Sequence, residues 1–166
     1  MAFTPDASGN NRITRMWYRV FASIPNEPNP AALVEYLHSL AHSFEPHFHG
    51  DDLGWTSASL DFPIGSPVTL GRYLTKADEL RNDLNAYAAE LETMDYNPNN
   101  VMLMEKVIQT QQLFTVRKPM DHGEESKLDS LCDALVKWLA KQTEGIIQID
   151  GRGWHTEDGT LLLQEY

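Results

Sequence analysis

This 166-residue chain has a single cysteine, few basic residues and no long apolar run. Because Cys132 has no second cysteine to pair with, an internal disulfide is excluded. The first residues lack the basic start and the apolar core of a secretory signal. No stretch approaches the roughly 18 consecutive apolar residues that are needed to cross a bilayer. These absences predict a cytoplasmic protein that does not span a membrane.

The shortage of basic residues leaves the chain strongly acidic. Thirteen Lys and Arg stand against 24 Asp and Glu, which gives a net charge of −11. Since the average field of such a protein repels phosphates, we expect neither nucleic acid nor an anionic membrane as a partner. The chain is 42% hydrophobic and 22% charged, an ordinary globular composition for a single domain of this length.

We expect a flexible tail over residues 1–12, where apolar groups are scarce, and one α+β domain over 13–166. Runs of β-branched and aromatic residues predict strands at 13–23, 47–50, 55–62, 112–118, 146–149 and 160–164. Apolar residues at three- and four-residue spacing predict helices over 30–46, 70–94, 101–110 and 121–145. The helix over 70–94 is the longest of these apolar patterns.

The order strand, helix, strand, glycine turn, Trp, strand occurs in the first third of the sequence and again in the last third. The turn residues of the two copies are Gly50, Gly54 and Trp55 in the first and Gly151, Gly153 and Trp154 in the second. We interpret 13–63 and 112–166 as two βαββ-like halves with a helical insert over 68–111. One half cannot cover both faces of its small sheet, so the halves should share one core. The sequence thus predicts a mixed or antiparallel sheet of about six strands, with helices packed on one face.

Histidines and aspartates gather after the first predicted helix. They are His38 and His42, four residues apart, then His47 and His49 at strand spacing, and then Asp51 and Asp52. Three of these groups and a water could hold zinc or a similar divalent ion, which would make the chain a metal-binding protein or a metal-assisted hydrolase. The competing interpretation is an exposed polar face at a helix end, without a cofactor. No His-Glu-x-x-His or cysteine-containing signature supports a metal.

Tryptophans mark the predicted strands and turns. Trp17 lies in the first strand, and Trp55 and Trp154 follow glycine turns. These rings are candidates for contacts with a ligand or a partner, whereas tryptophans at such positions more often fill the core and anchor hairpins. A small ligand bound between the two halves is an alternative function, because clefts between structural units are common ligand sites.

No familiar catalytic motif is present. Cys132 lies on the apolar stripe of a predicted helix, which favours a buried thiol over a nucleophile. The sequence has no Gly-x-Ser-x-Gly elbow, phosphate loop or dinucleotide fingerprint. We therefore expect a non-catalytic binding or protein-interaction module. It would dock a protein or a second copy of itself through aromatic residues around Trp55 and Trp154.

Two segments of the chain carry a resemblance to other proteins. One is the ending Ile-Gln-Ile-Asp-Gly-Arg-Gly-Trp over 147–154 with Asp-Gly-Thr-Leu-Leu-Leu over 158–163, and the other is Met-Trp-Tyr-Arg-Val-Phe over 16–21. Together they resemble uncharacterised bacterial proteins of similar length, and the likeness covers most of the chain. The resemblance implies a stand-alone bacterial cytoplasmic domain, and it carries no activity, cofactor or site residue.

Overall fold

The computed structural model describes residues 15–120 and 125–165, and the tail predicted over residues 1–12 lies outside these ranges. The strands are β1 (Arg15–Ala22), β2 (Glu45–Asp51), β3 (Gly54–Asp61), β4 (Val68–Leu74), β5 (Gln112–Pro119), β6 (Gly145–Ile149), β7 (Gly153–His155) and β8 (Leu161–Leu163). The helices are α1 (Pro30–Ser39), α2 (Arg81–Glu92), α3 (Asn100–Ile108) and α4 (Glu125–Thr143). No helix in these ranges combines the length and the apolar character that crossing a membrane requires.

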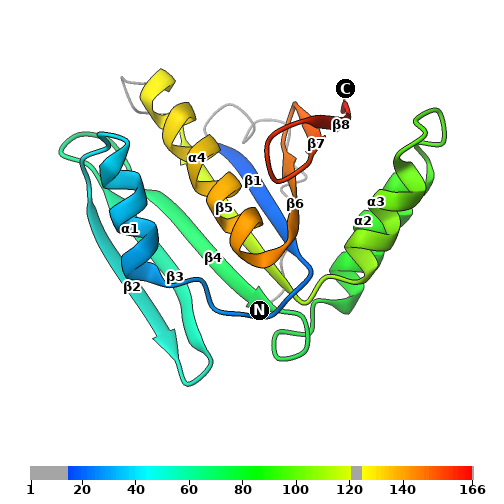
Figure 1. Cartoon of the computed structure of the whole chain (residues 1–166), viewed down its shortest axis with the longest axis horizontal. Helices are drawn as coiled ribbons and strands as arrows, with labels where there is room; N and C mark the ends of the chain where they lie inside the picture. The colour runs from blue at the N-terminus through cyan, green and yellow to red at the C-terminus, as the bar shows by residue number, and fades with distance from the viewer. Residues whose placement is uncertain (1–14, 121–124, 166) are drawn as a thin grey trace.

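The chain forms an α+β fold around one open antiparallel sheet (Figure 1). The strand order is β2-β3-β4-β5-β1-β6-β7-β8. The first predicted half supplies the central strand β1 and, beyond β5, the strands β2 and β3. The second half supplies the central strand β5 and, beyond β1, the strands β6, β7 and β8. The β2–β3–β4 meander runs inward to β5, whereas β6–β7–β8 runs outward from β1. The order strand, helix, hairpin therefore recurs in both halves. In the first half the hairpin runs from the edge of the sheet inward, and in the second half it runs from the centre outward.

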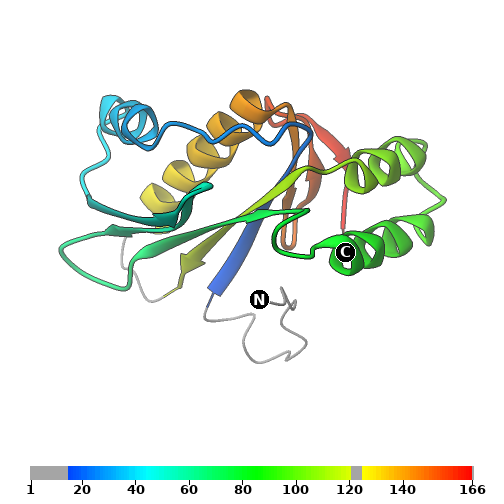
Figure 2. The ribbon, with the colours of Figure 1, turned by 90° about the horizontal axis from the view of Figure 1, so that it is seen from below.

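The sheet is larger than predicted, with eight strands instead of about six, and its helices cover both faces instead of one. Val20, Phe114 and Ile147 belong to a core packed against α1 and α4. The neighbouring residues Phe21, Leu113 and Ile146 point to the other face and pack in a second core with α2 and α3. Figure 2 shows α1 and α4 together on one side of the sheet, with the α2–α3 pair at the other end of the molecule. Helices occupy both faces because the central strands are apolar on both.

The predicted helix over 70–94 is wrong in its first part, where the chain forms β4 and a turn before α2 begins at Arg81. Leu70, Tyr73, Leu74 and Ala77 fit a helical period, but the sheet buries Val68, Leu70 and Arg72 on one face at a period of two. This segment forms a strand because it pairs with β3 on one side and with β5 on the other. The helical insert is thus shorter than the predicted 68–111.

A buried arginine ties the loop after β1 to the β2–β3 hairpin. The Arg72 guanidinium donates hydrogen bonds to Oε1 of Gln112 at 2.8 Å and to the carbonyls of Leu53 and Trp55 at 3.0 Å. The Gln112 side-chain amide in turn donates to the carbonyls of Ile24 and Asn26, both at 2.8 Å. Burial lowers the pKa of Arg72 from its ordinary value. These bonds fix the path along which the chain enters α1.

The glycine before each hairpin tryptophan has a left-handed backbone, with φ of +107° at Gly54 and +110° at Gly153. A Cβ at Gly153 would also lie 2.1 Å from the carbonyl oxygen of Leu163. Gly151 has a φ of +79° but nothing within 4 Å of the position of a Cβ. Both glycines of the β6–β7 turn thus have a positive φ, but only Gly153 has the backbone of β8 within 4 Å of the position of a Cβ.

This difference gives a matched pair of substitutions. Gly151→Ala should cost only backbone strain, about 1 kcal/mol of unfolding free energy. Gly153→Ala should cost about 3 kcal/mol, because overlap with the backbone of β8 adds to the strain. Urea denaturation of both variants measures the two losses. Equal losses would show that β8 does not pack against Gly153 as described.

Replacement of Arg72 should destabilise the fold more than replacement of an exposed arginine. Arg72→Met keeps the length of the side chain but leaves buried carbonyl oxygens without a donor, so we expect a loss of about 3 kcal/mol. The control is Arg81→Met, since exposed Arg81 makes one bond, to the carbonyl of Ile108, and should lose less than about 1 kcal/mol. Urea denaturation compares the two. An Arg72 loss as small as the control's would contradict the bridging role.

Candidate functional site

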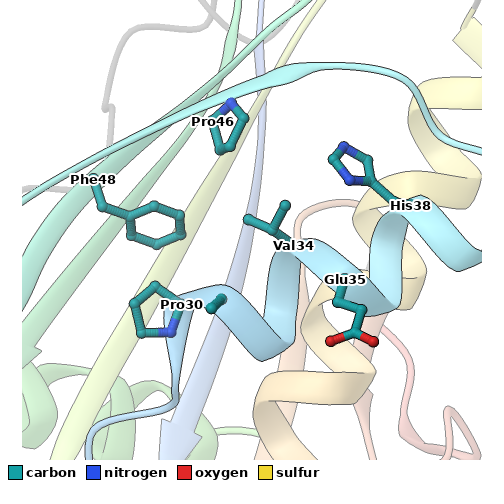
Figure 3. Close-up of a pocket in the computed structure, with 7 residues that line it drawn as sticks. Pro30, Val34, Glu35, His38, Pro46 and Phe48 are labelled. Carbon is teal, nitrogen blue, oxygen red and sulfur yellow. The ribbon is translucent and has the colours of Figure 1, made fainter.

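An open groove of about 550 Å³ lies between α1 and the edge strand β2. It is lined by Pro30, Ala31, Val34, Glu35 and His38 from α1 and by Pro46 and Phe48 from β2. Figure 3 shows Phe48 and Pro46 facing Pro30 and Val34 across the groove, while the carboxylate of Glu35 points away from β2. The groove lies within the first half of the chain and not between the two halves.

Local sequence explains both walls of the groove. Asn29 caps α1, its side chain accepting from the backbone N–H of Ala32 at 3.1 Å, and Pro30 occupies the first helical position. Leu33 and Leu37 face the core, so the helical row beside them, with Ala31 and Val34, faces β2. Along β2, alternation directs Pro46 and Phe48 into the groove.

The β2 wall of the groove is joined to the core by a row of aromatic rings. The Phe48 ring meets Trp55 edge-on with centroids 5.5 Å apart, and Trp55 lies 5.7 Å from Phe114. Trp55 Nε1 donates to the carbonyl of Pro28 at 2.9 Å, just before α1 begins. Trp55 therefore contacts Phe48 in the β2 wall and also holds the segment that leads into the α1 wall.

The groove also borders an unpaired strand edge. In the described part of the chain, β2 pairs with β3 alone and ends the sheet. Edge strands present backbone N–H and C=O groups that can pair with another extended chain. An apolar groove beside such an edge offers both backbone hydrogen bonds and a place for a side chain.

Of the seven residues that line the groove, only His38 was a site candidate predicted from the sequence, and it was predicted as a metal ligand. Pro46 and Phe48 alternate with His47 and His49 along the strand. The same alternation that places the two histidines on one face therefore places Pro46 and Phe48 on an apolar face. On α1, Val34 appears as part of the predicted core, yet it is only half-buried. The sequence contained the groove-facing rows but not the information that α1 and β2 lie side by side.

The predicted metal ligands do not converge. Among residues 15–120 and 125–165, no three His, Cys, Asp or Glu side chains form a group that could hold a metal ion. The His38 ring packs on Phe44 at 4.6 Å, and Nε2 of His47 lies 3.2 Å from Asp61. His42 lies beyond the end of α1, His49 is exposed on β2, and Asp51 and Asp52 are exposed at the hairpin tip. The six candidates are spread over a helix end, a strand and a turn.

His47, Asp61 and Ser59 come closest to a catalytic arrangement. Ser59 donates to one carboxylate oxygen of Asp61, and His47 contacts the other. In a nucleophilic triad the imidazole would instead contact the hydroxyl and accept its proton. Here Asp61 lies between Ser59 and His47, so the imidazole is not placed to take the proton of the serine. The three side chains form a polar face of the hairpin.

Two of the three candidate tryptophans are packed inside the protein. Trp55 is 5% exposed and Trp154 is 2% exposed. The expectation that a partner docks on exposed aromatic rings around them is therefore corrected: they anchor their hairpins in the two cores. Trp17 on β1 is half-buried.

A second polar cluster surrounds the single cysteine between α4 and the sheet. Arg152 Nη2 donates to the Tyr18 hydroxyl at 2.9 Å and lies 3.0 Å from Asp133. Buried Lys118 pairs with Asp129. Burial raises the pKa of the Cys132 thiol to about 12, although nearby Lys118 opposes the shift. The charged groups are paired with one another, so the cluster fixes α4 and leaves the thiol protonated.

Comparison of the chain with protein-family models, curated proteins and solved structures gives no match. The function is therefore argued from the geometry of the chain itself.

Cys132 should be inert in the native protein. At pH 8, a pKa of about 12 leaves roughly one thiol in ten thousand ionised, and burial blocks access to it. A chromogenic disulfide reagent should modify native Cys132 only as fast as the protein opens, and should modify the denatured chain within seconds to minutes. Rapid labelling of the native chain would contradict the packing around α4.

Proposed function

We propose that this protein is a non-catalytic interaction module that binds an extended segment of another protein along β2. One observation carries the proposal, namely that an apolar groove runs beside the unpaired edge of a sheet. In this mode the incoming segment adds a strand to the sheet, and every second side chain faces the groove. Backbone hydrogen bonds would supply affinity, and the groove would supply selectivity for the side chain.

The position of Phe48 supports this mode. Its ring lines the groove near the middle of β2 and rests on Trp55. A residue of the added strand directly opposite Phe48 would have its Cβ about 5 Å from that of Phe48, on the same face of the sheet. An aliphatic or aromatic side chain at that position would bury apolar surface against Val34 and Pro46.

The charges on β2 favour another protein over a second copy of this chain. In an antiparallel pair of two β2 strands centred on Phe48, Glu45 of each copy would lie opposite Asp51 of the other. Directly opposed like charges destabilise a strand pair. Pro46 has no N–H group to donate, which further weakens a symmetric ladder. The edge is thus poorly suited to self-pairing. A partner without these carboxylates avoids the charge repulsion and meets only the one missing donor of Pro46.

Two neighbouring alanines on α1 allow a matched test. Ala31 lines the groove and is exposed, and Ala32 is exposed but does not line it. A displayed library of random 12-residue peptides, selected on the wild-type protein, supplies the probe. Peptides that bind should lose at least tenfold in affinity for Ala31→Trp, whose ring fills the groove, and should bind Ala32→Trp as they bind wild type.

The location of binding is checked by backbone amide NMR. Selected peptides should shift the resonances of β2 and α1 and protect β2 amides from exchange. No enrichment from the library, or binders that ignore the Ala31→Trp change, would overturn the proposal. A concentration-dependent dimer that Ala31→Trp disrupts would assign the groove to a second copy instead.

A further inference from the structure

The groove lies in a long part of the chain that has no basic residue. From Val20 to Gly71, 52 consecutive residues include neither Lys nor Arg but contain six Asp and Glu and four of the six histidines. This stretch supplies α1, β2, β3 and their connections, all of them described by the structure. The fixed charge contributed by both walls of the groove and by the edge strand is therefore of one sign.

Three of the six carboxylates accept hydrogen bonds within the protein. Asp51 Oδ1 accepts from the backbone N–H of Leu53 at 2.8 Å, and its side chain stays exposed at the hairpin tip. Glu27 accepts a hydrogen bond from the backbone N–H of Trp55 at 2.8 Å. Asp61 accepts from Ser59 and contacts His47. Arg72, the first basic residue after the stretch, is buried and bonded to carbonyls of the hairpin, so it gives the surface no exposed cation.

Four carboxylates, Glu35, Glu45, Asp51 and Asp52, lie on α1, at the two ends of β2 and in the β2–β3 turn. All four are exposed, and none forms an ion pair with a Lys or Arg of the described ranges. Glu35 belongs to the groove lining on α1. Glu45 and Asp51 stand at the two ends of β2, six residues and thus about 20 Å apart.

The spacing on β2 defines a pattern in the partner. Glu45 and Asp51 are on the face of the strand opposite to Phe48, because side chains alternate. In an added strand, the residues across from Glu45 and Asp51 would lie three positions before and after the residue across from Phe48. A Lys or Arg at each of these outer positions would face a carboxylate, and an apolar residue at the centre would enter the groove.

We propose that the partner segment is cationic, with Lys or Arg residues about six positions apart on either side of an apolar residue. This inference rests on the proposed function, and it names the chemistry of the partner. Edge strands are commonly protected by lysines that face outward, whereas this edge has carboxylates and no lysine. The same carboxylates that oppose pairing with a second copy would favour a basic strand.

The first test is the composition of the selected peptides. Peptides that bind in the groove should be enriched in Lys and Arg on both sides of an apolar residue. For the tightest binder, replacement of its basic residues by Gln should weaken binding at least tenfold. Raising the salt concentration from 0.05 M to 1 M should weaken the basic peptide several-fold and leave the Gln peptide nearly unchanged, because salt screens exposed charges.

The second test uses variants of the protein. Each exposed charge pair contributes about two- to fivefold in affinity, so Glu45→Gln with Asp51→Asn should weaken the basic peptide about tenfold. The amide of Asn keeps an oxygen that can accept from the backbone N–H of Leu53. The control is Glu92→Gln with Glu105→Gln, which removes the same charge from exposed positions on α2 and α3. The control should have little effect, since these sites are remote from β2.

The outcomes separate the two proposals. If basic and Gln peptides bind equally well and both lose affinity for Ala31→Trp, the cationic partner is wrong and groove binding stands. If no peptide depends on Ala31, the proposed function itself fails. If the basic peptide binds Ala31→Trp as it binds wild type, or if both pairs of charge variants weaken it equally, the attraction is a general effect of the net charge and the inference is overturned.

Discussion

The buried guanidinium of Arg72 is the contact on which the groove depends. A charge removed from water must be met by polar groups, and Arg72 finds them in Gln112 and in backbone carbonyls of the β2–β3 hairpin. Gln112 then holds the segment that leads to α1. Since β1 lies at the centre of the sheet and β2 at its edge, the connection from β1 to β2, which includes α1, must pass β5, β4 and β3. The Arg72 network fixes the start of that connection, at Ile24 and Asn26 directly after β1.

Two apolar rows on the central strands account for the rest of the architecture. In β1 and β5, neighbouring residues such as Val20 and Phe21 are both buried, one in each core. A sheet with one wet face would show strict alternation of apolar and polar residues. In β1, only Arg15 and Arg19 interrupt a run of apolar residues, and this pattern indicates two covered faces. That signal was available in the sequence, and the prediction of helices on one face did not use it.

The sequence was sufficient where local patterns act alone and insufficient where distant pairing decides. Asn29 and Pro30 mark the start of α1, and Gly153 and Trp154 mark a hairpin, because caps and turns depend on a few adjacent residues. The stretch from Leu70 to Leu74 fits both periods, and only its neighbours β3 and β5 select the strand. The groove is harder still, because it requires knowing that α1 lies beside β2. Periodicity shows that Val34 and Phe48 each face something, but not that they face each other.

The acidic residues of β2 bear on the tendency of an edge strand to pair with other strands. An unpaired edge invites association with a second copy, and proteins oppose this with charges and prolines. Here Pro46 removes one donor, and Glu45 and Asp51 would oppose each other in a symmetric pair. Carboxylates and lysines on an edge strand exclude different partners. Carboxylates on β2 would repel a second copy of β2 but would attract a strand that carries Lys or Arg. In the proposed binding mode, the charges that would oppose pairing with a second copy are therefore also the charges that would select a basic segment.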